Sequence, residues 1–236
     1  MEYYQLNIST KLKVSIHFQK APEAISKLIS TALIRSGYDA HNEKKPKNYV
    51  FSNLGKANEN GIYEKEGTIS FRSFNKDLIK QVYDSLMFYE DNIFKIETVG
   101  FKKISYKHVK TIVALNPVFI VLKNGNFWTF NKTGEMISLF DAIEKNLIRK
   151  YETSFNDKIE NSHWFSEYVQ VTNNKPFTYY YKGVKFFGYK FYIHPKDDEI
   201  SQKLAFTAIA TGLGHKNSSV GGGYVKWQDV NGKWYY

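Results

Sequence analysis

The chain has 236 residues, of which 42% are hydrophobic and 24% are charged, so its composition excludes intrinsic disorder. It contains no cysteine, which excludes disulfide bonds, cysteine-ligated zinc and thiol catalysis. Lys and Arg outnumber Asp and Glu by 33 to 23, giving a net charge of +10, and aromatic residues make up 17%. This composition favours a protein that binds single-stranded nucleic acid, although a low-GC genome produces the same bias.

No part of the sequence resembles a membrane segment or an export signal. No stretch reaches the roughly 18 apolar residues that span a bilayer. Met1-Glu2-Tyr3-Tyr4 has neither the basic nor the apolar region of a signal peptide. We therefore expect a cytoplasmic protein that does not bind membranes.

The first half of the chain predicts four strands and two helices in the order βαββαβ. Period-two alternation indicates the strands, and apolar residues on one helical face indicate the helices. Gly37 is expected to end the first helix, and the Asn75 side chain to cap the second. The expected elements are a strand within residues 3–18, a helix from Pro22 to Gly37, strands Tyr49–Ser52 and Gly67–Phe74, a helix from Asn75 to Leu86 and a strand Ile93–Phe101.

The second half repeats this order apart from an inserted hairpin strand. Its expected elements are a strand Val109–Leu122, a hairpin turn at Asn124-Gly125 leading to Phe127–Phe130, an amphipathic helix Met136–Tyr151, strands Phe165–Val171 and Phe177–Ile193, a helix from Asp197-Asp198 to Gly212 and a strand from Tyr224. The sequence thus predicts an α+β protein with two tandem ferredoxin-like domains, residues 1–104 and 105–236. Because no Pro- or Ser-rich linker separates them, the two domains are expected to pack together.

The most distinctive stretch runs from Gly212 to Tyr224 and is called the Gly segment below. Five glycines in 12 positions allow positive φ angles, so successive N–H groups can form an anion-binding nest. A helix precedes the segment rather than following it, so a phosphate would be held by loop amides and Lys216 and not by a helix N-terminus. A Val at Gly214 or Gly221 is therefore expected to weaken ligand binding more than folding. The alternative is a flexible connection without a ligand.

The Gly segment, together with a helix, a polar loop that bears His41 and the strand Tyr49–Leu54, resembles the CRISPR-associated endoribonuclease that processes precursor CRISPR RNA. That family consists of tandem ferredoxin-like proteins with a C-terminal Gly-rich loop, and the resemblance spans nearly the whole chain. The loop is one residue longer than usual here, and Gly222 stands where the family commonly has a large apolar residue.

The resemblance implies that CRISPR repeat RNA is the partner and that its cleavage needs no metal ion or cofactor. A ribose 2′-hydroxyl attacks the adjacent phosphate, leaving a 2′,3′-cyclic phosphate and a 5′-hydroxyl. The match places the general base at His41, while Lys45 and Lys47 could stabilise charge and Tyr38 could orient the hydroxyl. The residues expected to contact RNA are Gly212, Gly214, His215, Lys216, Gly221 and Gly223; His215 is also the main rival to His41 as a catalytic group.

A further RNA surface is expected on the aromatic stretch from Lys175 to Lys196. One face of its predicted hairpin would join the core, and the other would present Lys182, Lys185 and Lys190 to RNA.

Two functions from different classes stay open at this point. The first is the repeat-cutting ribonuclease; the second is a non-cleaving RNA-binding protein of the same fold, such as a subunit of a CRISPR effector complex. A two-histidine phosphodiesterase is disfavoured, because no histidine is followed two residues later by Thr or Ser. The sequence is compatible with a monomer or a homodimer.

Overall fold

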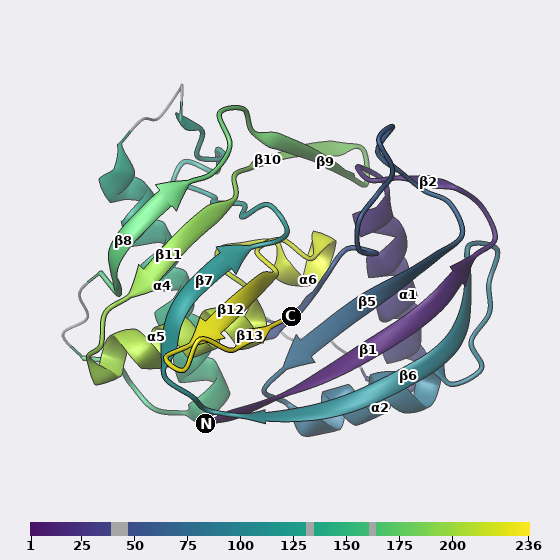
Figure 1. Ribbon diagram of the computed structural model, residues 1–236, viewed down its shortest axis with the longest axis horizontal. Helices are drawn as coiled ribbons and strands as arrows, with labels where there is room; N and C mark the ends of the chain where they lie inside the picture. The colour runs from purple at the N-terminus through teal and green to yellow at the C-terminus, as the bar shows by residue number, and fades with distance from the viewer. Residues whose placement is uncertain (39–46, 131–134, 161–163) are drawn as a thin grey trace.

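The computed structural model describes residues 1–38, 47–130, 135–160 and 164–236 and contains two antiparallel sheets side by side (Figure 1). His41 and Lys45 lie outside the described residues. Among the described residues, no helix combines the length and the apolar composition needed to cross a membrane.

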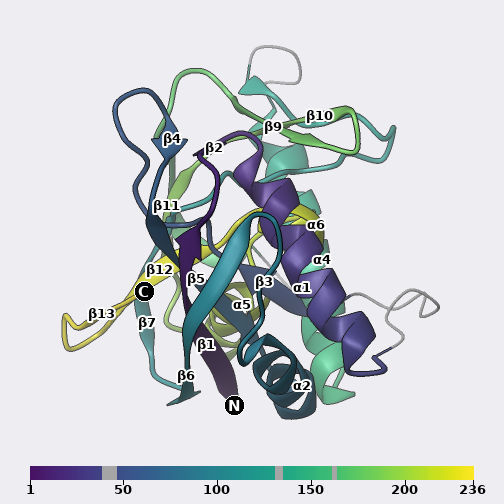
Figure 2. The same cartoon turned by 90° about the vertical axis from the view of Figure 1, so that its right-hand side faces the viewer.

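The first sheet has four strands in the order β3-β5-β1-β6. Helices α1 and α2 cover one of its faces (Figure 2), where Leu6 and Ile8 of β1 pack with Ile25 and Ile29 of α1. The Asn75 side chain caps α2 by accepting a hydrogen bond from the Leu78 amide, as predicted. This half of the chain contains the strands and helices β1 (Glu2–Leu12), α1 (Ala21–Arg35), β3 (Tyr49–Phe51), β5 (Glu66–Ser73), α2 (Lys76–Leu86) and β6 (Phe94–Ser105). The short strands β2 (Ile16–His17) and β4 (Ile62–Tyr63) pair with each other in a separate two-stranded sheet.

The second sheet has the order β13-β12-β7-β11-β8, and helices α4 and α5 pack on it through a second apolar core. Asp198 caps α5 by accepting from the Ser201 amide. The second half of the chain contains the strands and helices β7 (Val109–Ala114), α4 (Met136–Phe155), β8 (Ser166–Val171), β11 (Phe191–Pro195), α5 (Glu199–Thr211), α6 (Asn217–Val220), β12 (Val225–Asp229) and β13 (Trp234–Tyr235). A hairpin of β9 (Phe177–Tyr181) and β10 (Val184–Gly188) is inserted between β8 and β11.

The topology of both sheets confirms the predicted fold. In each sheet the first and third strands are central and the second and fourth lie outside them, which is the ferredoxin-like arrangement of a βαββαβ unit. The described strands of the first sheet end at Ser105, and those of the second begin at Val109.

Several predicted elements have different limits. The strand expected over Val109–Leu122 ends at Ala114, because Pro117 cannot donate to a ladder and the chain turns away. The strand expected over Phe177–Ile193 is three strands, since Lys182 and Gly183 both have positive φ and form a two-residue hairpin turn. Ile137, an apolar residue within the predicted amphipathic helix, is 76% exposed. The short helix α6 inside the Gly segment was not predicted.

The two halves meet through a buried arginine on β5. The Arg72 side chain is fully buried, its Nε donates to Gln5 Oε1 at 2.7 Å, and its Nη1 donates to the Val225 carbonyl at 2.9 Å. The guanidinium also lies 4.3 Å from the ring centre of Tyr224. Arg72 therefore fixes the uncovered face of the first sheet against β12 of the second.

Candidate nucleic-acid interface

A groove runs between the uncovered face of the first sheet and the second half of the chain. It consists of two neighbouring cavities of about 630 and 620 Å³, which share Thr68, Ser70 and Tyr236. Lys102 and Gln5 are paired across β6 and β1 and line one cavity, while Phe177 and Tyr179 of β9 line the other. The groove is thus formed by strands from both halves.

The lining of this groove is aromatic and basic. Among its described residues there is no Asp or Glu, whereas lysines line both cavities: Lys56 and Lys190 in one, and Lys102, Lys103 and Lys233 in the other. Tyr and Trp rings offer flat surfaces on which nucleobases stack, and unpaired lysines attract phosphates. Such a groove favours a single-stranded polyanion as its ligand.

Lys190 is held in the groove by packing rather than by a carboxylate. Its Nζ lies 5.0 Å from the ring centre of Phe177, and burial lowers the pKa of its ammonium group. No carboxylate of the described residues pairs with it. An anionic ligand would therefore meet a cation that is already partly stripped of water.

The three lysines predicted to share one face of the β9–β10 hairpin are separated. Lys190 lies over Phe177, on the strand face that also carries Tyr179, whereas Lys185 lies over Tyr180 on the opposite face. Lys182 is in the hairpin turn, and its backbone N–H donates to Glu23 of α1 at 2.9 Å. The prediction of a single basic face was wrong, because Lys185 lies on the face opposite to that of Lys190, which points into the groove.

The glycines of the Gly segment are buried. A Cβ atom on Gly214 would lie 2.7 Å from Val118 Cγ1 and 2.9 Å from the Phe119 carbonyl oxygen. A Cβ on Gly221 would overlap the Phe51 carbonyl, and one on Gly223 would overlap the Leu213 carbonyl. The expectation that these glycines leave room for a ligand is not met, since they leave room for β3 and for the chain around Phe119.

The segment also does not form the open nest of amides that the sequence suggested. Several of its N–H groups donate within the protein: Gly212 to Ala208, Leu213 to Gly223, His215 to Phe119, Gly222 to Lys216 and Gly223 to Pro117. The side chain of Lys216 lies over the ring of Phe186 at 5.2 Å from its centre. A phosphate bound here would therefore meet side chains rather than the amides of Gly212 or Gly223.

A buried lysine that the sequence analysis missed holds this segment in place. Lys150 of α4 is 5% exposed, and its Nζ donates to the carbonyls of Gly212 and Gly214 and to Asn217 Oδ1, at 2.7, 2.9 and 2.7 Å. Burial lowers the pKa of Lys150 to about 7. The sequence contained a signal for the burial of Lys150, because this residue follows Leu147 by three positions and therefore lies on the buried face of the helix.

This pKa predicts how stability depends on pH. Between about pH 7 and the value of 10.5 for a solvated lysine, the unfolded chain binds a proton at Lys150 that the folded chain does not hold. The free energy of unfolding should therefore rise with pH, relative to Lys150→Met, by up to about 1.4 kcal/mol per pH unit. Urea unfolding of both proteins at pH 7, 8 and 9 measures the difference. Parallel pH curves would contradict this prediction.

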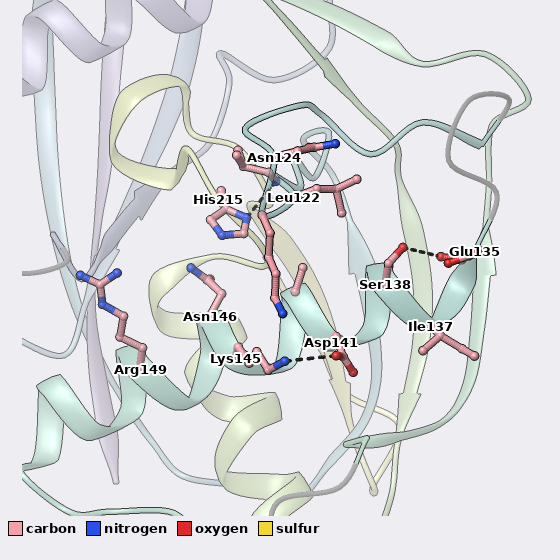
Figure 3. A pocket seen from close by; sticks show the side chains of 13 residues that line it. Leu122, Asn124, Glu135, Ile137, Ser138, Asp141, Lys145, Asn146, Arg149 and His215 are labelled. Carbon is pink, nitrogen blue, oxygen red and sulfur yellow. Dashed lines mark hydrogen bonds and ion pairs between the residues drawn. The ribbon is translucent and has the colours of Figure 1, made fainter.

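His215 stays neutral in a third cavity, of about 670 Å³, between α4 and the chain around Leu122 (Figure 3). Burial, assisted by the nearby charge of Lys150, lowers its pKa to about 4. Its Nδ1 accepts a hydrogen bond from the Val121 amide at 3.3 Å, which leaves the proton on Nε2. In this arrangement His215 can donate a hydrogen bond to a ligand but is poorly suited to act as a base.

The described residues nearest to His41 in the sequence are Tyr38 and Lys47. Tyr38 is half-buried against the first core, and Lys47 is half-buried just before β3. The next residue, Asn48, donates to the Lys150 carbonyl at 3.1 Å and to Ser154 Oγ at 2.8 Å. The chain leading into β3 is therefore attached to the same turn of α4 that holds the Gly segment.

The fold has close counterparts among solved structures. A structure described as CRISPR-associated protein Cas6 matches with a TM-score of 0.69 and 18% identity over 94% of this chain and 98% of its own. A Cas6-related protein from Pyrococcus furiosus matches with 0.72 and 18% over 97% and 99%. A RAMP protein described as binding different RNA substrates matches with 0.72 and 16% over 96% and 100%. No family model and no curated protein sequence matches the chain. Along nearly its whole length, the chain therefore has the tandem ferredoxin-like fold of solved Cas6 and RAMP proteins.

Proposed function

We propose that this protein binds CRISPR repeat RNA and cuts it as a metal-independent endoribonuclease of the Cas6 type. The observation that carries the proposal is the groove, whose described lining contains lysines but no Asp or Glu, on a fold shared over 97% of the chain with a structure described as a Cas6 product complex. The proposal joins the expected chemistry at His41 to a surface suited to an extended RNA strand.

The groove would bind the RNA in an extended form. Bases would stack on rings such as Tyr236, which is 63% exposed and lines both cavities, while Lys102 and Lys190 would pair with phosphates. Ser70 and Thr68 at the junction offer hydroxyl groups to riboses or base edges. This division of roles makes affinity depend on salt and on stacking more than on base sequence.

The chemistry would be transfer of the phosphoryl group to the neighbouring ribose oxygen. His41 removes the proton from the 2′-hydroxyl, this oxygen bonds to phosphorus, and the bond to the 5′-oxygen breaks. The 5′-oxygen takes up a proton from water, which gives the cyclic phosphate and a 5′-hydroxyl. Lys45 and Lys47 stabilise the negative charge of the transition state, and Tyr38 orients the hydroxyl. Together these residues supply the base and the cations that the reaction needs.

The test is incubation of the protein with its repeat RNA in EDTA, under single-turnover conditions. We expect cleavage at one position within the repeat, with product ends that resist 3′ ligation until the cyclic phosphate has been opened and the phosphate removed. Tight binding without cleavage would instead identify a non-cleaving RNA-binding protein. Absence of both would overturn the proposal.

The location of the RNA predicts a change in salt dependence. Lys102→Ala together with Lys190→Ala should flatten the slope of log K against log salt by about 1.4, since each lost phosphate contact on a single strand is worth about 0.7. Lys80→Ala, on the exposed face of α2, serves as the control for a lost positive charge.

The matched comparison is Lys182→Ala with Lys185→Ala, which removes the same charge from the hairpin. If this second pair of substitutions changes the slope of log K against log salt more than the first pair does, the RNA binds the hairpin rather than the groove.

A further inference from the structure

Lys150 and Asn217 form a buried polar pair that binds the Gly segment from within. The Lys150 amino group accounts for the carbonyls of Gly212 and Gly214, as described above. Asn217 Nδ2 donates to the carbonyls of Leu213 and Gly222, at 3.2 and 2.6 Å. Two side chains thus satisfy four backbone carbonyls of the segment, and they are joined to each other at 2.7 Å.

The same residue of α4 also binds the chain that leads into β3. Asn48 donates to the Lys150 carbonyl, while the Lys150 side chain reaches the Gly segment. The Gly segment touches β3 directly as well, because the space beside Gly212 is taken by Val50. Lys150 therefore lies where α4, β3 and the Gly segment meet.

A lysine is a costly choice for this position. No carboxylate of the described residues pairs with Lys150, so no counter-ion compensates for burial of its ammonium form, and its pKa falls to about 7. An apolar side chain of similar volume at such a site is often neutral or stabilising for the fold. What the apolar residue cannot do is donate hydrogen bonds to the Gly212 and Gly214 carbonyls and so fix their direction.

We propose that Lys150 is a positioning residue, which holds the Gly segment and the chain around Asn48 in a single arrangement for RNA. Lys216 on the one side and Lys47 on the other are then presented to the ligand at a fixed separation. The effect on RNA rests on the proposed function; the effect on the Gly segment does not.

The first experiment needs no RNA. Hydrogen exchange in Lys150→Met should become at least about tenfold faster in peptides covering residues 212–224 and 47–51, and stay unchanged in peptides of α2. Asn217→Ala should accelerate exchange in the same peptides, and the double variant should add little, because both changes remove one connected pair. Unchanged exchange in the Gly segment of both single variants would overturn the proposal. So would a uniform acceleration over the whole chain, which would make Lys150 a general determinant of stability.

The second experiment measures function in the folded variants. Lys150→Met and Asn217→Ala should bind the repeat RNA about tenfold more weakly, whereas their affinity for oligo-uridine, which needs only the groove, should equal that of the wild type. Lys80→Met is the control for loss of a lysine on a helix. Equal affinity for the repeat RNA in variant and wild type would reject the positioning role. If the wild-type protein does not bind repeat RNA, the proposed function is rejected. The hydrogen-exchange data then still decide whether Lys150 holds the Gly segment in place.

Discussion

Replacement of His41 by Ala should slow single-turnover cleavage of the repeat RNA by at least about a hundredfold. A positioned general base contributes about 10²- to 10⁴-fold to proton abstraction, and the imidazole is the group whose pKa lies near neutrality. Binding of the RNA should change by less than about threefold, because the histidine acts on a proton rather than on a phosphate. Rates at saturating protein and affinities from filter binding separate the two effects.

Two controls make this result specific. His194→Ala, on β11, removes an imidazole that hydrogen bonds to the Lys110 carbonyl, and it should leave the rate unchanged. A deoxyribose on the 5′ side of the scissile phosphate should abolish cleavage by the wild type, since the nucleophile is gone. Full activity of His41→Ala would reject His41 as the general base. Cleavage of the deoxy substrate would reject the 2′-hydroxyl mechanism altogether.

Replacement of Gly221 by Ala should destabilise the protein severely. The residue has a φ of 62°, and its added methyl group would overlap the Phe51 carbonyl of β3. Gly183 provides a matched control, because its φ of 77° carries the same backbone penalty and nothing lies within 4 Å of its Cβ position. We expect about 1 kcal/mol for Gly183→Ala and at least about 2 kcal/mol more for Gly221→Ala, measured by urea unfolding.

This expectation reverses the one drawn from the sequence, where the glycines were assigned to the ligand. If both variants lose the same free energy of unfolding, the Phe51 backbone can move away from the added methyl group at little cost. A Gly221→Ala protein with normal stability and weakened RNA binding would restore the original interpretation.

The fold was predictable because its signals are local. The caps at Asn75 and Asp198 and the apolar faces of α1 and α2 depend on residues within one or two turns of each other, and they are visible in a linear sequence. Pro117 is a visible signal for the end of β7, but the apolar pattern continues beyond it because the chain after Ala114 makes isolated bridges, such as Val118 with Tyr189.

The site was less predictable because it depends on contacts between distant residues. Gly221 looks like a loop residue until Phe51 is placed against it, and Lys150 looks like one more basic residue of an amphipathic helix. The groove draws on β1, β5 and β6 together with residues beyond 170, so no stretch of sequence contains it. The catalytic role of His41, the supporting roles of Lys45, Lys47 and Tyr38, and the choice of CRISPR repeat RNA as substrate rest on resemblance alone.

The contact of Arg72 with β12 has a consequence for how the protein is made. Arg72 and Val225 are 153 residues apart, so the Nη1 group of Arg72 lacks this acceptor until residue 225 has left the ribosome. Before the Gly segment is made, the edge strand β3 also lacks the contact between Phe51 and Gly221, and exposed edges are templates for pairing with other chains. Contacts of such long range also slow folding. The first half of the chain is therefore expected to complete its fold only after the second half has been synthesised, so the two ferredoxin-like units fold as one cooperative unit.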